Sequence, residues 1–221
     1  MIPSSSILRR KVVIDVLHLT HYQYISEIIE SGELTCPIWL LVDPKYPEVR
    51  HKIWTPVLSE IQEKVYLLLH KRIDTAKIYT RYTVKDKKLI PNTLNWWSKE
   101  VVEEIGIFRE LVIKYHPKVL ISFGAFTFEF TRRVYDIKPE KGPIYWENAI
   151  LGEEFLRAIQ EFDITKTNRI PLLRRLVSET KFIEGSNFNQ NCDCQNYYKY
   201  VGAKIADKII ENKDSFNIWI D

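Results

Sequence analysis

The sequence is poor in the residues that build disulfide frameworks, metal clusters and glycine-rich loops. It has seven glycines in 221 residues and three cysteines, Cys36, Cys192 and Cys194. So few cysteines argue against a disulfide framework, and three cannot supply the four ligands of an iron–sulfur cluster. Cys192 and Cys194 have the wrong spacing for a zinc knuckle. We therefore expect no metal at this pair, which we interpret as two ordinary loop thiols.

Long apolar runs and a strong net charge are also absent. No stretch approaches the roughly 20 apolar residues of a membrane helix, and the N-terminal sequence lacks the apolar core and cleavage site of a signal peptide. The net charge of +3 comes from 32 basic and 29 acidic residues. Such a mild charge neither demands nor excludes a polyanionic partner. We expect a soluble, cytoplasmic protein without a membrane partner, and the sequence does not indicate an oligomeric state.

Apolar residues, by contrast, are plentiful and alternate between two periods along the chain. Short apolar or β-branched runs predict strands, whereas apolar residues three or four apart predict helices. This alternation predicts a single α/β domain, a three-layer α/β/α sandwich around a parallel four-stranded sheet, with an N-terminal helical extension over about residues 1–36. Strands are expected over 37–43, 76–84, 118–124 and 168–173, and helices over about 51–72, 101–115, 126–134, 152–162 and 197–212.

The first predicted strand ends in a carboxylate and two prolines, in the sequence LLVDPKYP. In a parallel sheet, ligands bind where the strands bring their C-terminal ends to a common edge. Asp43 therefore lies where a reacting group would lie in this architecture. Asp and Pro are also ordinary turn formers, so a purely structural turn fits the same residues.

A second notable segment is RIPLLRR, in which Arg169, Arg174 and Arg175 alternate with apolar residues. This pattern suits a loop that contacts phosphates and inserts Leu172 or Leu173 into a groove. It is also typical of a short buried strand flanked by solvated arginines, the interpretation favoured by the tendency of charge clusters to cover surfaces. Sequence alone leaves both interpretations open.

Three segments together resemble the uracil-DNA glycosylase superfamily. LLVDPKYP is similar to its first motif, KVLISFGAFTFEFTRRV to its strand-to-helix unit, and the stretch from RIPLLRRLVSETKF to NYYKYVGAKIADKII to its DNA-inserting loop and final helix. They occur in the order of that superfamily and span residues 37–211. The resemblance implies a uracil-DNA glycosylase-like fold and an activity in DNA repair that requires no metal and no organic cofactor.

The resemblance also implies roles for individual residues. Asp43 would orient water for attack on the anomeric carbon, and Tyr46 would replace the aromatic residue near it. Asn168 would take the place of the histidine that stabilises charge on the departing base. Leu41 and Val42 depart from the small and polar residues that usually precede the aspartate. The candidates for binding the base are Trp54 and Asn92. The candidates for binding the DNA duplex are Arg169, Leu172, Arg174 and Arg175.

Three functions remain open from the sequence. The first is a DNA glycosylase that hydrolyses the N-glycosidic bond of uracil or a damaged base, after flipping it from the duplex. The second is a catalytically silent relative that binds nucleic acid or protein, which the departures from the motifs favour. The third is a hydrolase of free nucleosides or nucleotides at the same edge of the sheet.

Overall fold

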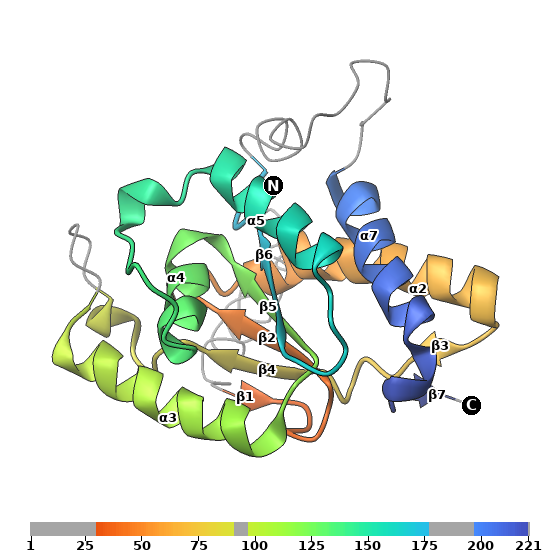
Figure 1. The fold of residues 1–221 in the computed structure, drawn as a ribbon, viewed down its shortest axis with the longest axis horizontal. Coiled ribbons are helices and arrows are strands. Elements are labelled where there is room, and N and C mark those ends of the chain that lie inside the picture. The colour runs from red at the N-terminus through yellow and green to blue at the C-terminus, as the bar shows by residue number, and fades with distance from the viewer. Residues whose placement is uncertain (1–29, 91–96, 177–196, 221) are drawn as a thin grey trace, which may run out of the picture.

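The computed structural model describes residues 30–90, 97–176 and 197–220 and shows an α/β protein built on a five-stranded sheet (Figure 1). The predicted N-terminal helix lies outside these residues. All four predicted strands and all five helices after residue 50 are confirmed. The strands are β2 (Ile38–Val42), β4 (Tyr79–Tyr82), β5 (Val119–Phe123) and β6 (Asn168–Leu172), and the helices are α2 (Thr55–Leu69), α3 (Lys99–Tyr115), α4 (Gly124–Val134), α5 (Asn148–Gln160) and α7 (Tyr197–Glu211).

The predicted sheet was wholly parallel and had four strands. The observed sheet has five strands and is mixed. Its order is β1-β4-β2-β5-β6, and the four predicted strands pair in parallel. The extra strand β1 (Glu30–Ser31) pairs antiparallel with β4, although its residues fall in the expected helical extension. Pro171 is compatible with β6 because β6 is an edge strand, where a missing backbone N–H is tolerated.

Helices cover both faces of the sheet, and each face has its own apolar cluster. One cluster joins alternate strand residues such as Leu40 and Ile121 to α2, α5 and α7. The other joins Trp39, Leu41 and Leu120 to α3 and α4. Figure 1 shows the sheet between these two groups of helices. Continuous burial along β2 and β5 explains why their sequences are apolar without alternation.

Shorter elements complete the described chain. A π-helical turn (Arg50–Trp54) leads into α2, and three 3₁₀ turns span Lys87–Leu89, Pro143–Tyr145 and Lys213–Ser215. Strands β3 (Arg72–Ile73) and β7 (Trp219–Ile220) form a separate antiparallel pair beside the end of α2. No helix of the described residues is both long and apolar enough to cross a bilayer.

Two helical glycines offer a matched test of the packing between α2 and α7. A Cβ added at Gly202 would lie 2.6 Å from Cβ of Glu60 and 3.0 Å from the carbonyl oxygen of Val57, whereas a Cβ at Gly106 meets nothing within 4 Å. Gly202→Ala is therefore expected to lower the free energy of unfolding by about 1–3 kcal/mol through overpacking. Gly106→Ala is expected to raise it by roughly 0.5–1 kcal/mol, because alanine favours the helix. Urea denaturation measures both; equal shifts would contradict the close approach of the two helices.

Candidate functional site at the carboxyl edge of the sheet

The strand order places a topological switch point at the C-terminal ends of β2 and β5. From β2 the chain moves outward to β4, then crosses back over β2 to β5 and continues outward to β6. Open α/β sheets bind ligands in the crevice at such a reversal. Asp43 follows β2 and Gly124 follows β5, so both residues lie at the switch point.

Asp43 is buried at this edge and held by its own turn. The residue is only 4% exposed, and its Oδ1 accepts a hydrogen bond of 2.8 Å from the Lys45 backbone N–H. The Tyr46 N–H donates to the Asp43 carbonyl oxygen at 2.9 Å. Burial raises the pKa of Asp43 above its ordinary value, and the Lys45 N–H and the charge of Arg174 oppose that rise. The turn is thus rigid, and it also retains a carboxyl group that is largely withdrawn from water.

Arg174 comes from the far side of β5 to meet this turn. Its guanidinium carbon lies 3.9 Å from the centroid of the Tyr46 ring. It crosses directly over Gly124, where an added Cβ would lie 3.0 Å from Cβ of Arg174. Gly124 has φ +82°, a left-handed conformation that glycine adopts at no steric cost. The switch point therefore brings together Asp43, Tyr46, Gly124 and Arg174.

The loops that follow the parallel strands are rich in basic residues at the same edge. These loops contain two acidic residues that are exposed or half-buried, Glu48 and Asp86. A surplus of cations on one face is the electrostatic footprint of a phosphate-binding surface. The basic residues of these loops are Lys45 after β2, Lys85, Lys87 and Lys88 after β4, and Arg174 and Arg175 after β6.

Asn168 lies at the other end of the sheet, so the prediction that it acts beside Asp43 is wrong. It begins β6, whereas Asp43 follows the end of β2, and the two strands run in the same direction. A five-residue strand is about 16 Å long, which separates the two side chains by roughly that distance. The Asn168 amide instead holds the turn before β6, by hydrogen bonds to the backbone of Lys118, Asp163 and Lys166.

Leu172 does not insert into a groove, because it is fully buried in the apolar cluster on the α2 face. Leu173 is buried as well, and its N–H donates to the Tyr197 hydroxyl at 2.8 Å. Arg169 stands near the start of β6, one residue after Asn168, and so lies away from Arg174 and Arg175. The RIPLL part of the segment is thus a buried strand, and only the two arginines after it reach the carboxyl edge.

Trp54 and Asn92, the two candidates for binding the base, complete the set of predicted site residues. Trp54 is 6% exposed and packs in the cluster on the α2 face, where it lines a cavity of about 340 Å³, so it does not stack beside Asp43. Asn92 lies outside the described residues, as do Cys192 and Cys194. Within the described chain, His, Cys, Asp and Glu side chains form no group of three that could hold a metal ion.

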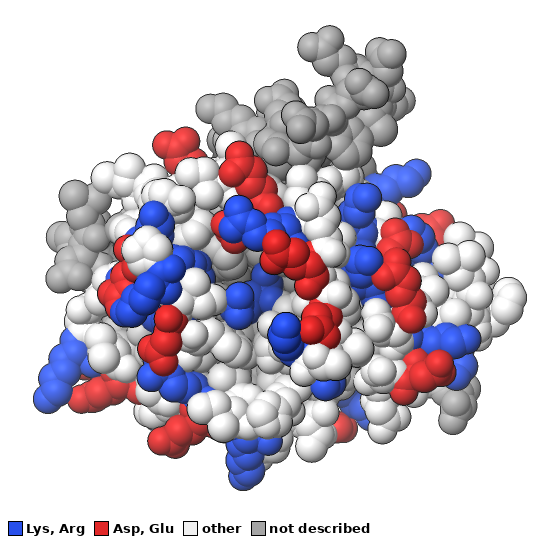
Figure 2. Space-filling model, in the orientation of Figure 1, with Lys and Arg blue, Asp and Glu red and all other residues white. Residues whose placement is uncertain are grey.

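Sequence reasoning missed a larger cavity on the flank of β6, between α4 and α5. It has a volume of about 900 Å³ and is lined by Arg169 and Arg132, together with the aromatic residues Trp146 and Tyr135. Figure 2 shows a hollow in the surface over this region, with Lys and Arg side chains in and around it. The sequence signals are Arg169, which is predicted to contact DNA, and a pair of arginines at the end of α4, which a solvated helix face explains equally well. Asp43 lines neither cavity.

Comparisons with known proteins identify no relative of this chain. No protein-family model matches the sequence, and neither a curated protein nor a solved structure matches it.

Proposed function

We propose that this chain binds DNA through the carboxyl edge of its sheet, as a divergent relative of the uracil-DNA glycosylases with the three-layer fold of that superfamily. The observation that carries the proposal is the convergence of Asp43 and Arg174 at the switch point, from strands that are not neighbours. The basic loops around them would contact phosphates and fix the register of the duplex.

In the enzymatic form of the proposal, Asp43 orients a water molecule and accepts its proton as the water oxygen bonds to C1′ of the sugar. The bond from C1′ to the base nitrogen breaks, and the base leaves with the electron pair and takes up a proton. The negative carboxylate also stabilises the positive charge that develops on the sugar. The charge of Arg174 acts on Asp43 more strongly than that of Lys45, so Arg174 takes the role expected of Asn168 and offsets charge on the departing base.

Two observations favour a second candidate, a nucleic-acid-binding module without catalysis. The side chains of Leu41 and Val42 are completely buried, so the space before Asp43 is filled. Asn168, the residue expected to assist the departing base, is committed to the turn before β6. This candidate uses the same basic edge and predicts binding without product.

One experiment separates the two candidates. Uracil-containing oligonucleotides, single- and double-stranded, are incubated with the chain and treated with alkali to reveal abasic sites. The enzyme is expected to yield product, and Asp43→Asn is expected to slow release by about 10²-fold or more. Product that Asp43→Asn leaves unchanged would exclude Asp43 as the water-orienting group.

DNA binding is measured in parallel as a function of salt. The logarithm of the affinity should fall linearly with the logarithm of the salt concentration, and Arg174→Gln should reduce the slope by about 1. Salt-dependent binding without product supports the silent module. Failure of the wild-type chain to bind DNA even at low salt would overturn both candidates.

The pH dependence of stability shows whether the Asp43→Asn variant is folded. Because burial raises the pKa of Asp43, its protonated form stabilises the fold, and that stability is lost as the pH rises through the folded-state pKa. Asparagine is neutral throughout and retains the oxygen that accepts the Lys45 N–H. The variant is therefore expected to be more stable than wild type at pH 7, with the difference vanishing as the pH falls below about 4. Thermal denaturation from pH 3 to pH 8 measures it.

A further inference from the structure

The cavity between α4 and α5 is lined by an arginine that forms no ion pair with the described residues. This residue is Arg169: no described carboxylate lies within ion-pair distance of it, although Glu154 acts on its charge from farther away, and its guanidinium forms no hydrogen bond with the described residues. Its guanidinium lies over the Tyr135 ring, 5.1 Å from the guanidinium carbon to the ring centroid. A partly buried cation normally has a partner, because its desolvation is otherwise uncompensated.

Most of the other cations of the cavity are paired with carboxylates. Six Lys or Arg residues line the cavity against three Asp or Glu residues, and two of the six, Arg132 and Lys138, pair with Glu129 and Glu140, which lie outside the lining. Burial lowers the pKa of Arg169 and the nearby charge of Arg132 lowers it further, whereas Tyr135 and the more weakly acting Glu154 oppose this shift. The six basic residues are Arg132, Lys138, Lys141, Arg157, Lys166 and Arg169, and the three acidic ones are Glu154, Glu161 and Asp163.

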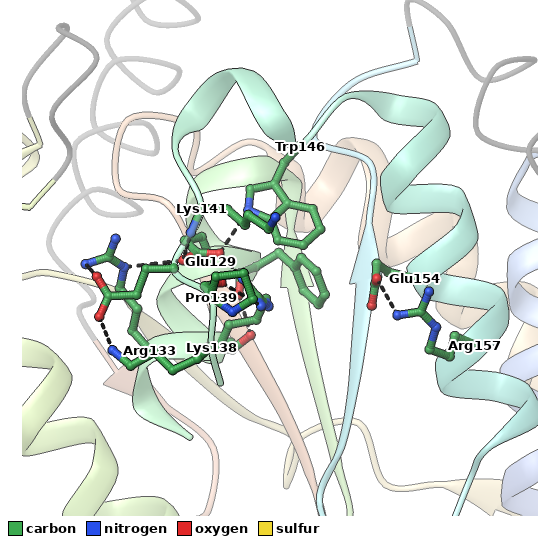
Figure 3. A network of polar contacts seen from close by, with 12 residues as sticks. Glu129, Arg133, Lys138, Pro139, Lys141, Trp146, Glu154 and Arg157 are labelled. Atoms are coloured by element: carbon green, nitrogen blue, oxygen red, sulfur yellow. Dashed lines mark hydrogen bonds and ion pairs between the residues drawn. The ribbon is translucent and has the colours of Figure 1, made fainter. Parts of the chain in front are cut away.

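A buried network fixes the wall opposite Arg169. Glu129 is fully buried on α4 and accepts hydrogen bonds from Arg132, from the Lys141 backbone N–H and from the Trp146 indole. Figure 3 shows this network joining α4 to the segment that leads to α5, with the Glu154 and Arg157 pair on the α5 side of the cavity. Arg132 is satisfied by Glu129 and the Pro139 carbonyl. Arg169 therefore faces a preformed wall whose own arginine is already paired.

We propose that this cavity binds a small phosphorylated molecule whose phosphate group pairs with Arg169. A guanidinium matches phosphate oxygens through two parallel hydrogen bonds, and a phosphate would supply the ion-pair partner that Arg169 lacks among the described residues. The volume of about 900 Å³ leaves room for an organic body as large as a nucleoside. Tyr145 and Trp146 supply the aromatic surface against which that body lies. The site is independent of the carboxyl edge, because it opens beside the start of β6.

Calorimetric titration with three probes tests the site: inorganic phosphate, adenosine 5′-monophosphate and adenosine. Wild type is expected to bind both phosphate-bearing probes, the nucleotide more tightly than free phosphate, and not the neutral nucleoside. Arg169→Gln is expected to weaken nucleotide binding by about 10- to 100-fold, the loss expected for hydrogen bonds to a charged group. Arg72→Gln is the matched control, since Arg72 also lies over a tyrosine ring, that of Tyr66, but is exposed on β3 outside the cavity; a change below about threefold is expected.

Stability without ligand provides a second measurement. Because Arg169 has no acidic partner among the described residues, Arg169→Gln is expected to leave the melting temperature unchanged or to raise it, which separates lost binding from lost folding. Arg174→Gln should leave nucleotide binding intact, which distinguishes this site from the proposed DNA surface. The proposal is overturned if no phosphorylated probe binds to wild type at millimolar concentration, or if Arg169→Gln binds the nucleotide as well as wild type does.

Discussion

Glu129→Ala is expected to lower the free energy of unfolding by about 3–5 kcal/mol, because the substitution leaves Arg132 buried without its partner. Arg132 is 7% exposed, and its Nη1 donates to Glu129 Oε2 at 2.7 Å. The same carboxylate accepts the Trp146 indole N–H at 3.0 Å and the Lys141 N–H at 2.8 Å. Each donor left unsatisfied adds a desolvation penalty. A loss this large would remove a major part of the stability of an ordinary domain.

A matched variant on the surface isolates the effect of burial. Glu140 pairs with Arg133 Nη1 at 2.9 Å, but its side chain is 43% exposed. Glu140→Ala is therefore expected to cost at most about 1 kcal/mol. Urea denaturation, followed by fluorescence, gives both values. Similar losses for the two variants would show that the Glu129 network contributes no more than an exposed ion pair.

The scaffold could be predicted from the sequence because burial leaves a strong periodic signal. β5 is an apolar run in the sequence, and α3 ends where Pro117 requires it to. Asp43 could be placed at the carboxyl edge for the same reason, since it directly follows an apolar strand. The position of Arg174 beside it then follows from the parallel direction of β2 and β6.

The errors at the site have equally specific causes. The resemblance to the glycosylase motif puts Asn168 beside Asp43, but Asn168 begins β6 whereas Asp43 follows the end of β2, so about one strand length separates them. The arginines near Leu172 suggested a loop that inserts into a groove. The apolar residues around Leu172 instead form an edge strand whose side chains face the core. Glu129 leaves no signal, since a buried glutamate in a helix looks in sequence like a solvated one. Its partners lie up to 17 residues away.

The arginine in the middle of β4 does carry a signal, because a charge within a buried strand requires a partner. Arg81 is 3% exposed and its Nη2 donates to Glu104 Oε2, on α3, at 2.6 Å. Glu30 Oε1 lies 3.5 Å from its Nε. Arg81→Met leaves the buried Glu104 charge without its partner, and Glu104→Leu leaves Arg81 with only the half-exposed Glu30, so each variant is expected to cost about 3–5 kcal/mol.

The double variant, Arg81→Met with Glu104→Leu, is expected to recover most of that loss. With both charges removed, the two introduced apolar side chains would pack against Phe108, over which the Arg81 guanidinium now lies, and the free energy of unfolding should return to within about 1 kcal/mol of wild type. The exposed pair of Lys208 and Glu211 on α7 is the control, and Lys208→Met should cost only about 0.2–0.5 kcal/mol. Denaturation of the four proteins of the cycle yields the coupling energy. If the losses of the single variants simply add in the double variant, the two charges are not coupled, and the α3 face must be held by apolar packing alone.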